Sequence, residues 1–373
     1  MLLNSILNQN PYLMMLYMVI IMSTAIIGTF PQFKKNSTKG IGWGFLGFLT
    51  FAMAMFPFQS GDFIHMAISF QTNTGLQHYE DFFIWLWEIT DNIILWRAVI
   101  YGGSTLFLIG TIKLLNVNSK FSAFIFVITQ MFMFGALRNM LGLTAMFFCI
   151  ALFFYAFYQN KNIILLVIAC VGLYFCIYLH RSMWLYLLLL IPAVIPFGKK
   201  IIRLSIFTFP FLYISVFILS AWFLSSFGDA EAQQHASYYT ESERATTLMK
   251  TINELLKLGA YLYLLHIIFR YIRSRRYQIP IVFKFLARYA YILIYIGFLF
   301  YGQGTGDWLF ERFTWTGEMA LMFSIMWFYY FFPRTRNVRI AFGILLYQIL
   351  YQILYICTYA SSGYISRFNT ITL

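Results

Sequence analysis

Long runs of apolar residues, separated by short polar stretches, recur along the whole 373-residue chain. The runs are about 17–22 residues long, which is enough to cross about 30 Å of hydrocarbon as an α-helix. They are continuous rather than alternating, which disfavours a transmembrane β-barrel. The pattern therefore predicts an all-α, polytopic integral membrane protein with about 12 transmembrane helices, at residues 11–30, 40–58, 95–112, 121–137, 140–158, 163–179, 183–197, 204–224, 258–272, 286–302, 316–332 and 340–360.

Two of these spans form a predicted hairpin, in which the polar turn 159–162 joins span 140–158 to span 163–179. Arg138 precedes the first span, and His180 and Arg181 follow the second. Because two consecutive spans return the chain to the same membrane face, we expect these three side chains to gather at one surface.

Composition supports this class of protein: 61% of the residues are hydrophobic and 10% are charged, whereas a soluble domain carries roughly a quarter charged residues. No charged side chain precedes Lys34, so the first apolar run is expected to be a retained span and not a signal peptide. The four cysteines all lie in predicted spans, at spacings that indicate neither a disulfide framework nor a zinc site.

The net charge of +13 is mostly a topology signal. Most of the basic residues fall on or beside alternate connections, and all 13 acidic residues fall on the other side. Short basic loops stay cytoplasmic, so both termini are expected outside, and nucleic acid is not an expected partner. The sequence indicates one polytopic domain, residues 1–373, with long outer loops at 59–94, 225–257 and 303–315. We expect short interfacial helices in 59–94, and a helix in the second half of 225–257 that begins near Thr240 or Ser242.

Four arginines lie near the outer ends of predicted spans, against the usual charge bias: Arg97, Arg138, Arg181 and Arg312. The planar guanidinium group matches pairs of phosphate oxygens. Each arginine alone could instead extend to lipid headgroups or pair with a carboxylate such as Asp91 or Glu311. Taken together, the four favour a shared anionic ligand.

His180 and Ser182 directly follow a span, and the histidine suits either a proton acceptor or an ordinary interfacial hydrogen bond. Asp62 and His65 lie one helical turn apart after a glycine, and a loop cap with a surface histidine is the alternative there.

A group of charged residues lies near the start of a predicted span: Asp307, Glu311, Arg312 and Glu318. They could bind substrate, and the alternative is a solvated cluster of salt bridges.

Several signals are absent from the sequence. It contains no Walker A loop, HExxH, GxSxG or Asp-x-Asp pair, and most span interiors lack ionisable residues, with His266 a mild exception. A coupled ion transporter usually carries buried carboxylates near the midplane, so that class is disfavoured. We expect no cofactor and no metal.

Four segments together resemble the EpsG family of Wzy-like bacterial exopolysaccharide polymerases: GDFIHMAISF (61–70), ALRNMLGLTAMFF (136–148), CIYLHRSMWLYLLL (176–189) and FERFTWTGEMAL (310–321). The family has four elements in order, and each has a match here. The acidic element matches Asp62, and the arginine that opens a span matches Arg138. The His-x-Ser element matches His180 with Ser182, and the late arginine matches Arg312. The chain departs from the family in having Phe70 and then Tyr79 in place of a tyrosine-rich element, and an Arg within His-Arg-Ser.

The resemblance implies a polymerase, with an architecture like that of the GT-C glycosyltransferases, at the outer face of a bacterial plasma membrane. It would transfer a polyprenyl-diphosphate-linked oligosaccharide onto the next lipid-linked repeat. Its partners would be that donor and acceptor, membrane lipids and a chain-length regulator protein. The expected catalytic residues are His180, Arg138 and Asp62. The expected substrate-binding residues are Arg97, Arg181, Ser182, Arg312, His65, Asp307 and Glu311.

Three other classes stay open. A flippase for the same lipid-linked sugar should show polar groups through the membrane thickness. A membrane O-acyltransferase should have a buried catalytic histidine served from the cytoplasm. A dolichol-type mannosyltransferase should have an acidic pair in its first outer loop, for which Glu80 and Asp81 are candidates.

Overall fold

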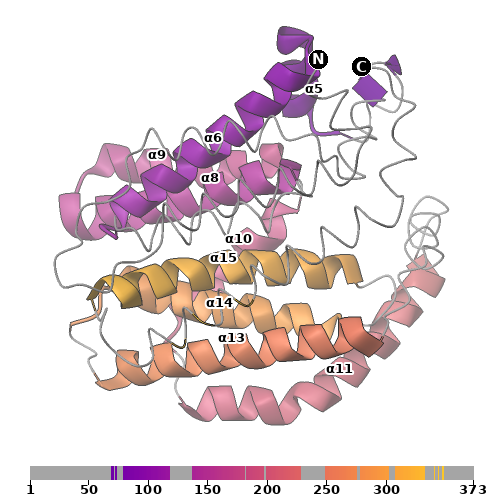
Figure 1. Cartoon of the computed structure of the whole chain (residues 1–373), viewed down its shortest axis with the longest axis vertical. Coiled ribbons are helices and arrows are strands. Elements are labelled where there is room, and N and C mark those ends of the chain that lie inside the picture. Colours follow the sequence, from indigo (N-terminus) through magenta and orange to yellow (C-terminus); the bar gives the residue numbers. More distant parts are fainter. Residues whose placement is uncertain are drawn as a thin grey trace. The chain divides into compact units, whose positions relative to one another are not determined.

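The computed structural model describes residues 69–70, 72–73, 79–117, 137–180, 182–196, 199–227, 248–274, 278–301 and 307–331, with the single positions 340, 343 and 347. Every regular element in these ranges is a helix (Figure 1). The elements are α5 (Asp81–Thr90), α6 (Ile93–Leu114), α8 (Leu137–Phe154), η2 (Tyr155–Asn160), α9 (Ile163–Leu179), α10 (Met183–Val194), α11 (Lys199–Phe227), α13 (Leu248–Ser274), α14 (Ile281–Leu299) and α15 (Asp307–Phe331). The predicted all-α class is confirmed for this part of the chain.

Within the described ranges, four helical segments are long and apolar enough to cross a membrane: Leu95–Leu114, Arg138–Asn160, Glu254–Ser274 and Ile281–Leu299. α9 and α10 are apolar but shorter. One face of α9 exposes large aliphatic side chains, among them Ile164, Ile168 and Val171, as expected of a surface that meets lipid tails. The predicted spans 11–30, 40–58, 121–137 and 340–360 lie outside the described residues, apart from isolated positions.

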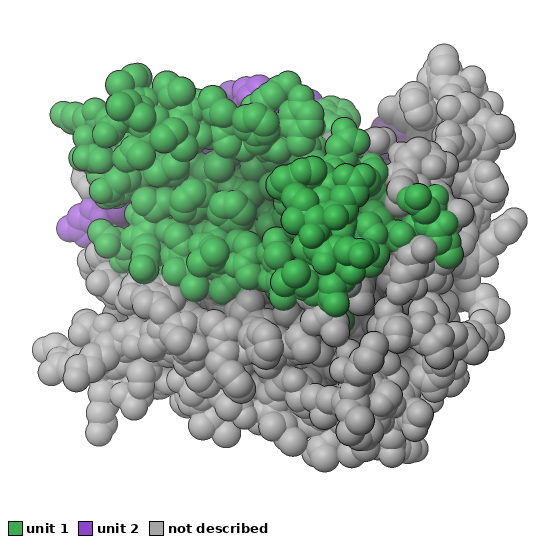
Figure 2. Space-filling view, turned by 90° about the horizontal axis from the view of Figure 1, so that it is seen from above, with its two compact units in different colours: residues 1–184, 326–373 green, residues 185–325 purple. Residues whose placement is uncertain are grey.

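The chain divides into two compact units, coloured separately in Figure 2: Met1–Trp184 with Met326–Leu373, and Leu185–Ile325. In the first unit, α8 packs along both α6 and α9, and the short helix α5 packs against α6 and α9. In the second unit, α14 packs against α13 and α11.

The predicted hairpin around the turn 159–162 is confirmed. α8 continues into the π-helical turn η2, Lys161 adopts a left-handed conformation with φ of 49°, and the chain then reverses into α9. The Asn162 side chain caps α9 by accepting hydrogen bonds from the backbone N–H groups of Ile164 and Leu165. α8 and α9 approach closely at Gly172, where an added Cβ would lie 2.6 Å from Sγ of Cys149.

Helices in the predicted outer loops have bounds that differ in part from those the sequence indicated. In 59–94, α5 confirms the expected short helix. The boundary of loop 303–315 is wrong, because α15 begins at Asp307. In 225–257, the expected helix in the second half is α13, which begins at Leu248 and runs on into the apolar segment; Thr240 and Ser242 lie outside the described residues. At α15, helical hydrogen bonding begins before the apolar run, so hydropathy alone placed the start of this helix too late.

Candidate functional site

Glu80 occupies the N-cap position of α5, with an extended backbone conformation (φ −70°, ψ 140°). Its backbone carbonyl accepts hydrogen bonds from the N–H groups of Phe83 and Ile84, at 2.9 and 3.4 Å. Its side chain makes no capping hydrogen bond to the helix. The carboxylate is therefore directed away from the helix it precedes, toward the ends of α8 and α9.

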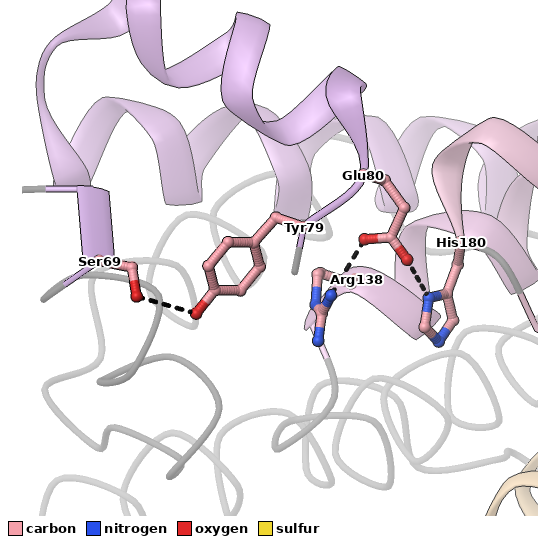
Figure 3. Close-up of polar contacts among 5 residues, drawn as sticks. All are labelled: Ser69, Tyr79, Glu80, Arg138 and His180. Atoms are coloured by element: carbon pink, nitrogen blue, oxygen red, sulfur yellow. Dashed lines mark hydrogen bonds and ion pairs between the residues drawn. The ribbon is translucent and has the colours of Figure 1, made fainter. Parts of the chain in front are cut away.

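Two of the predicted site residues meet at this carboxylate (Figure 3). Nη1 of Arg138, in the first turn of α8, donates to Oε2 of Glu80 at 3.0 Å. Nδ1 of His180, the C-cap residue of α9, lies 2.7 Å from Oε1 of the same carboxylate. The hairpin thus brings its entry and exit residues to one face, as expected, and Glu80 bridges them. We call these three residues the Glu80 triad.

Burial and pairing act in opposite directions on Glu80. Burial alone would raise the pKa of this carboxyl, but the hydrogen bond from His180 and the positive charges of Arg138 and His180 lower the pKa more, from 4.5 to about 2. Glu80 is therefore ionised at any physiological pH. A carboxylate this acidic is a poor proton acceptor near neutral pH, and its role in the triad is to hold its two partners.

The bond to Glu80 fixes the tautomer of His180. A carboxylate can only accept hydrogen bonds, so Nδ1 carries a proton and donates it. The nitrogen that can exchange a proton with a bound molecule is then Nε2. His180 sits at a corner between two helices, with its backbone extended (φ −163°, ψ 123°) and its carbonyl accepting from the N–H group of Met183.

An aromatic cluster supports the Arg138 side of the triad. The Arg138 guanidinium group lies over the ring of Tyr79, 5.2 Å from its centroid, and the Tyr79 hydroxyl is 3.3 Å from Oγ of Ser69 (Figure 3). Phe70 packs against Tyr79, and it also contacts Trp87 and Trp96. Phe70 and Tyr79, where the sequence departs from the family it resembles, therefore both lie in the cluster beside Arg138.

Arg97 is nearly fully buried in α6, at 6% exposure, next to Trp96 of the aromatic cluster. Its side chain contacts Tyr101, one turn further along the same helix. A buried arginine on the predicted outer side remains consistent with an anion-binding role.

The other predicted site residues are placed as follows. Ser182 is buried directly before α10, two residues after His180. Glu311 and Arg312 are half-buried in the first turns of α15, and Asp307 begins that helix. These three belong to the second unit, so the structure does not join them to the triad. Asp62, His65 and Arg181 lie outside the described residues.

A second charged cluster lies within the second unit. Nζ of Lys257 on α13 is 2.6 Å from Oε1 of Glu318 on α15, whose side chain is only 3% exposed. Glu254 is a weaker partner of the same ammonium group, at 4.0 Å, and the Tyr261 ring lies 5.8 Å away. The sequence grouped Glu318 with Asp307 and Arg312, and Lys257 was not among its candidates.

Sequence reasoning missed the central role of Glu80, which it weighed only as half of an acidic pair with Asp81. The structure separates these two carboxylates: Glu80 is buried and ion-paired, whereas Asp81 is exposed in the first turn of α5. Among the described residues, no group of three His, Cys, Asp or Glu side chains has the arrangement of a metal site. The available signal was an acidic residue directly before an aromatic-rich helix, on the side that also holds Arg138 and His180.

Comparison with known proteins found no matching family model, no similar curated protein and no similar solved structure.

Proposed function

We propose that this chain is a membrane glycosyltransferase of the polymerase type. It would transfer an oligosaccharide from a polyprenyl diphosphate onto the next lipid-linked repeat, at the outer face of a bacterial plasma membrane. The observation that carries the proposal is the Glu80 triad: an ionised carboxylate that orients a histidine and an arginine at one end of an apolar helical hairpin.

In this proposal His180 acts as the general base. The acceptor hydroxyl attacks the anomeric carbon of the donor's reducing-end sugar, and the bond from that carbon to the diphosphate oxygen breaks. The hydroxyl proton passes to Nε2 of His180, while Nδ1–H stays bonded to Glu80. Glu80 stabilises the imidazolium that forms, which is the role a carboxylate plays beside a catalytic histidine in other enzymes.

The departing polyprenyl diphosphate gains negative charge that fixed cationic donors can stabilise. Arg138 uses Nη1 for Glu80, and a guanidinium group has five N–H donors in all. The Arg138 side chain is 21% exposed, so its remaining donors can reach a bound ligand. Arg97 is the second candidate in the same unit, and Arg312 remains a candidate on resemblance alone.

The membrane setting supports a lipid-linked substrate. The triad lies at the ends of helices whose apolar faces are exposed on the molecule, as in α9. A polyprenyl chain lying along such a face would bring its diphosphate to the level of Arg138. The twelve-span topology, the outward termini and the GT-C-like architecture belong to this proposal.

Transport without chemistry is the main alternative, as a flippase for the same lipid-linked sugar. A flippase needs to bind its substrate but has no use for a histidine held in one tautomer by a buried carboxylate. An O-acyltransferase would use a buried histidine reached from the cytoplasm, whereas His180, although buried, lies on the side that the charge pattern predicts to be outside.

A cell-based experiment separates the two functions. In the native host, His180→Ala should leave single lipid-linked repeats accumulating at the outer leaflet, where an impermeant sugar-oxidising label reaches them. A flippase variant would instead trap those repeats at the inner leaflet, where the label does not reach, and that result would overturn the proposal.

A further inference from the structure

Asn139 lies in the first turn of α8, directly after Arg138, and is 4% exposed. Neither its Oδ1 nor its Nδ2 atom has a hydrogen-bond partner in the structure as described. Ser182, two residues after His180, is also buried, and its Oγ atom likewise lacks a partner there. Buried polar groups are normally paired, and an unpaired amide in an apolar surrounding is destabilising.

Each of the two unpaired groups is close in sequence to a member of the Glu80 triad. α8 and the start of α10 touch at Gly142, where an added Cβ would lie 3.2 Å from Cε of Met183. Asn139 precedes Gly142 by one turn on the same face of α8, and Ser182 is the neighbour of Met183. Arg138, directly before Asn139, and His180, two residues before Ser182, are both bonded to Glu80. Asn139 and Ser182 are therefore each within two residues of a triad member, on two segments that touch at Gly142 and Met183.

The chemistry of the unpaired atoms indicates what they bind. Nδ2 of Asn139 offers two donors and Oδ1 offers an acceptor, while Oγ of Ser182 can do either. A diphosphate has only acceptors near neutral pH, so it would leave Oδ1 unpaired. A sugar hydroxyl or an acetamido group donates and accepts at once, and a ring with neighbouring hydroxyls can satisfy both atoms of an amide.

We infer that Asn139 and Ser182 bind the acceptor sugar, through its hydroxyl or acetamido groups, beside Nε2 of His180. The inference rests on the proposed function and deepens it. It divides the site into an arginine part that holds the diphosphate and a neutral part that holds the sugar. Without bound sugar the unpaired amide lowers the stability of the fold, and hydrogen bonds to a bound sugar would restore it.

The test uses thermal unfolding of the full chain, purified in detergent. The probes are a panel of free neutral hexoses, deoxyhexoses and N-acetylhexosamines, with inorganic pyrophosphate as the anionic probe. The variants are Asn139→Leu, which keeps the shape of the side chain without its polar atoms, and Ser182→Ala. Thr144→Val is the matched control, because Thr144 is buried in the same helix but its hydroxyl donates to the carbonyl of Met140.

We expect at least one sugar to raise the unfolding temperature of the wild-type chain. The rise in unfolding temperature with sugar should be lost in Asn139→Leu and in Ser182→Ala, and kept in Thr144→Val. Any rise in unfolding temperature with pyrophosphate should be kept in Asn139→Leu. Without ligand, Asn139→Leu should unfold about 1–3 °C above wild type, because it removes an unpaired buried amide.

Several results would overturn the inference: no sugar stabilises the wild-type chain, the sugar effect survives in both variants, or Asn139→Leu abolishes a pyrophosphate effect. A lower unfolding temperature for ligand-free Asn139→Leu would also overturn it, because the amide would then have a structural partner. Free-sugar binding requires no transfer reaction. A chain that binds sugar through Asn139 but forms no polymer would contradict the proposed function and leave this site in place.

Discussion

Nδ1 of His180 lies 2.7 Å from Oε1 of Glu80, a residue 100 positions earlier in the chain. The contact joins the start of α5 to the end of α9 within the first unit, and Arg138 at the start of α8 shares the same carboxylate. A buried carboxylate placed between a histidine and an arginine sets the geometry of both.

Replacing Glu80 should impair catalysis more than insertion or folding. Glu80→Gln removes the charge that orients His180 and stabilises its protonated form, so we expect the turnover rate to fall about 10–100-fold. Glu80→Asp keeps the charge on a shorter side chain and should recover part of the loss. The measurement is polymer formed per folded protein in membranes, with the neighbouring exposed residue as control in Asp81→Asn. Full activity of Glu80→Gln would show that the Glu80 carboxylate takes no part in the mechanism.

Replacing Arg138 by lysine should also be costly, although the charge is conserved. Lysine has one nitrogen and cannot donate to Glu80 and to a diphosphate with the forked geometry of arginine. We expect polymer to fall about tenfold or more, and the apparent KM for the lipid-linked donor to rise. Arg203→Lys, an exposed position on α11, is the control and should behave as wild type. Equal activity of the two variants would argue against a bidentate role for Arg138.

Acid should weaken the first unit through Glu80. The folded-state pKa of this carboxyl is about 2, below its ordinary 4.5, so Glu80 stabilises the fold above about pH 4.5 and loses that contribution as the pH falls toward 2. A shift of this size corresponds to about 3 kcal/mol. The wild-type chain should therefore exceed Glu80→Gln in unfolding free energy near neutral pH, and the difference should disappear on acidification. A difference that does not depend on pH would contradict the assignment.

In the second unit, we expect variants of the Lys257–Glu318 ion pair to change the free energy of unfolding. Glu318→Gln leaves a mostly buried ammonium group without its nearest charged partner, 2.6 Å away, and we expect a loss of about 3 kcal/mol. The double variant Lys257→Met, Glu318→Leu removes both charges and should regain most of that stability. Glu254→Gln, whose carboxylate is 4.0 Å from Lys257, should cost about 1 kcal/mol or less. Thermal unfolding of the purified chain measures all three, and additive losses in the double variant would show that the pair is not coupled.

Part of the site could be predicted from sequence because membrane spans impose a simple geometry. Two apolar runs joined by a short turn must return the chain to one face, so Arg138 and His180 were expected together before any contact was known. Asn162, in the predicted turn, then caps α9.

The partner of these residues could not be predicted in the same way. Glu80 is 58 residues from Arg138 and 100 from His180, and no periodicity links positions in different elements. The unpaired amide of Asn139 also has no sequence signature, because an asparagine in a helix more often faces water or a cap. The start of α15 was missed for a local reason, since Asp307–Trp315 is too polar to extend an apolar run yet forms the first turns of that helix.

We propose that the Glu80 triad catalyses glycosyl transfer from a lipid diphosphate. The most direct measurement is the release of polyprenyl diphosphate by the purified chain in lipid vesicles that carry lipid-linked repeats from the native host. The account predicts one diphosphate released for each new glycosidic linkage by the wild-type chain, and loss of both products together in His180→Ala. A wild-type chain that releases no diphosphate and forms no linkage, or a His180→Ala chain that does so at the wild-type rate, would contradict it.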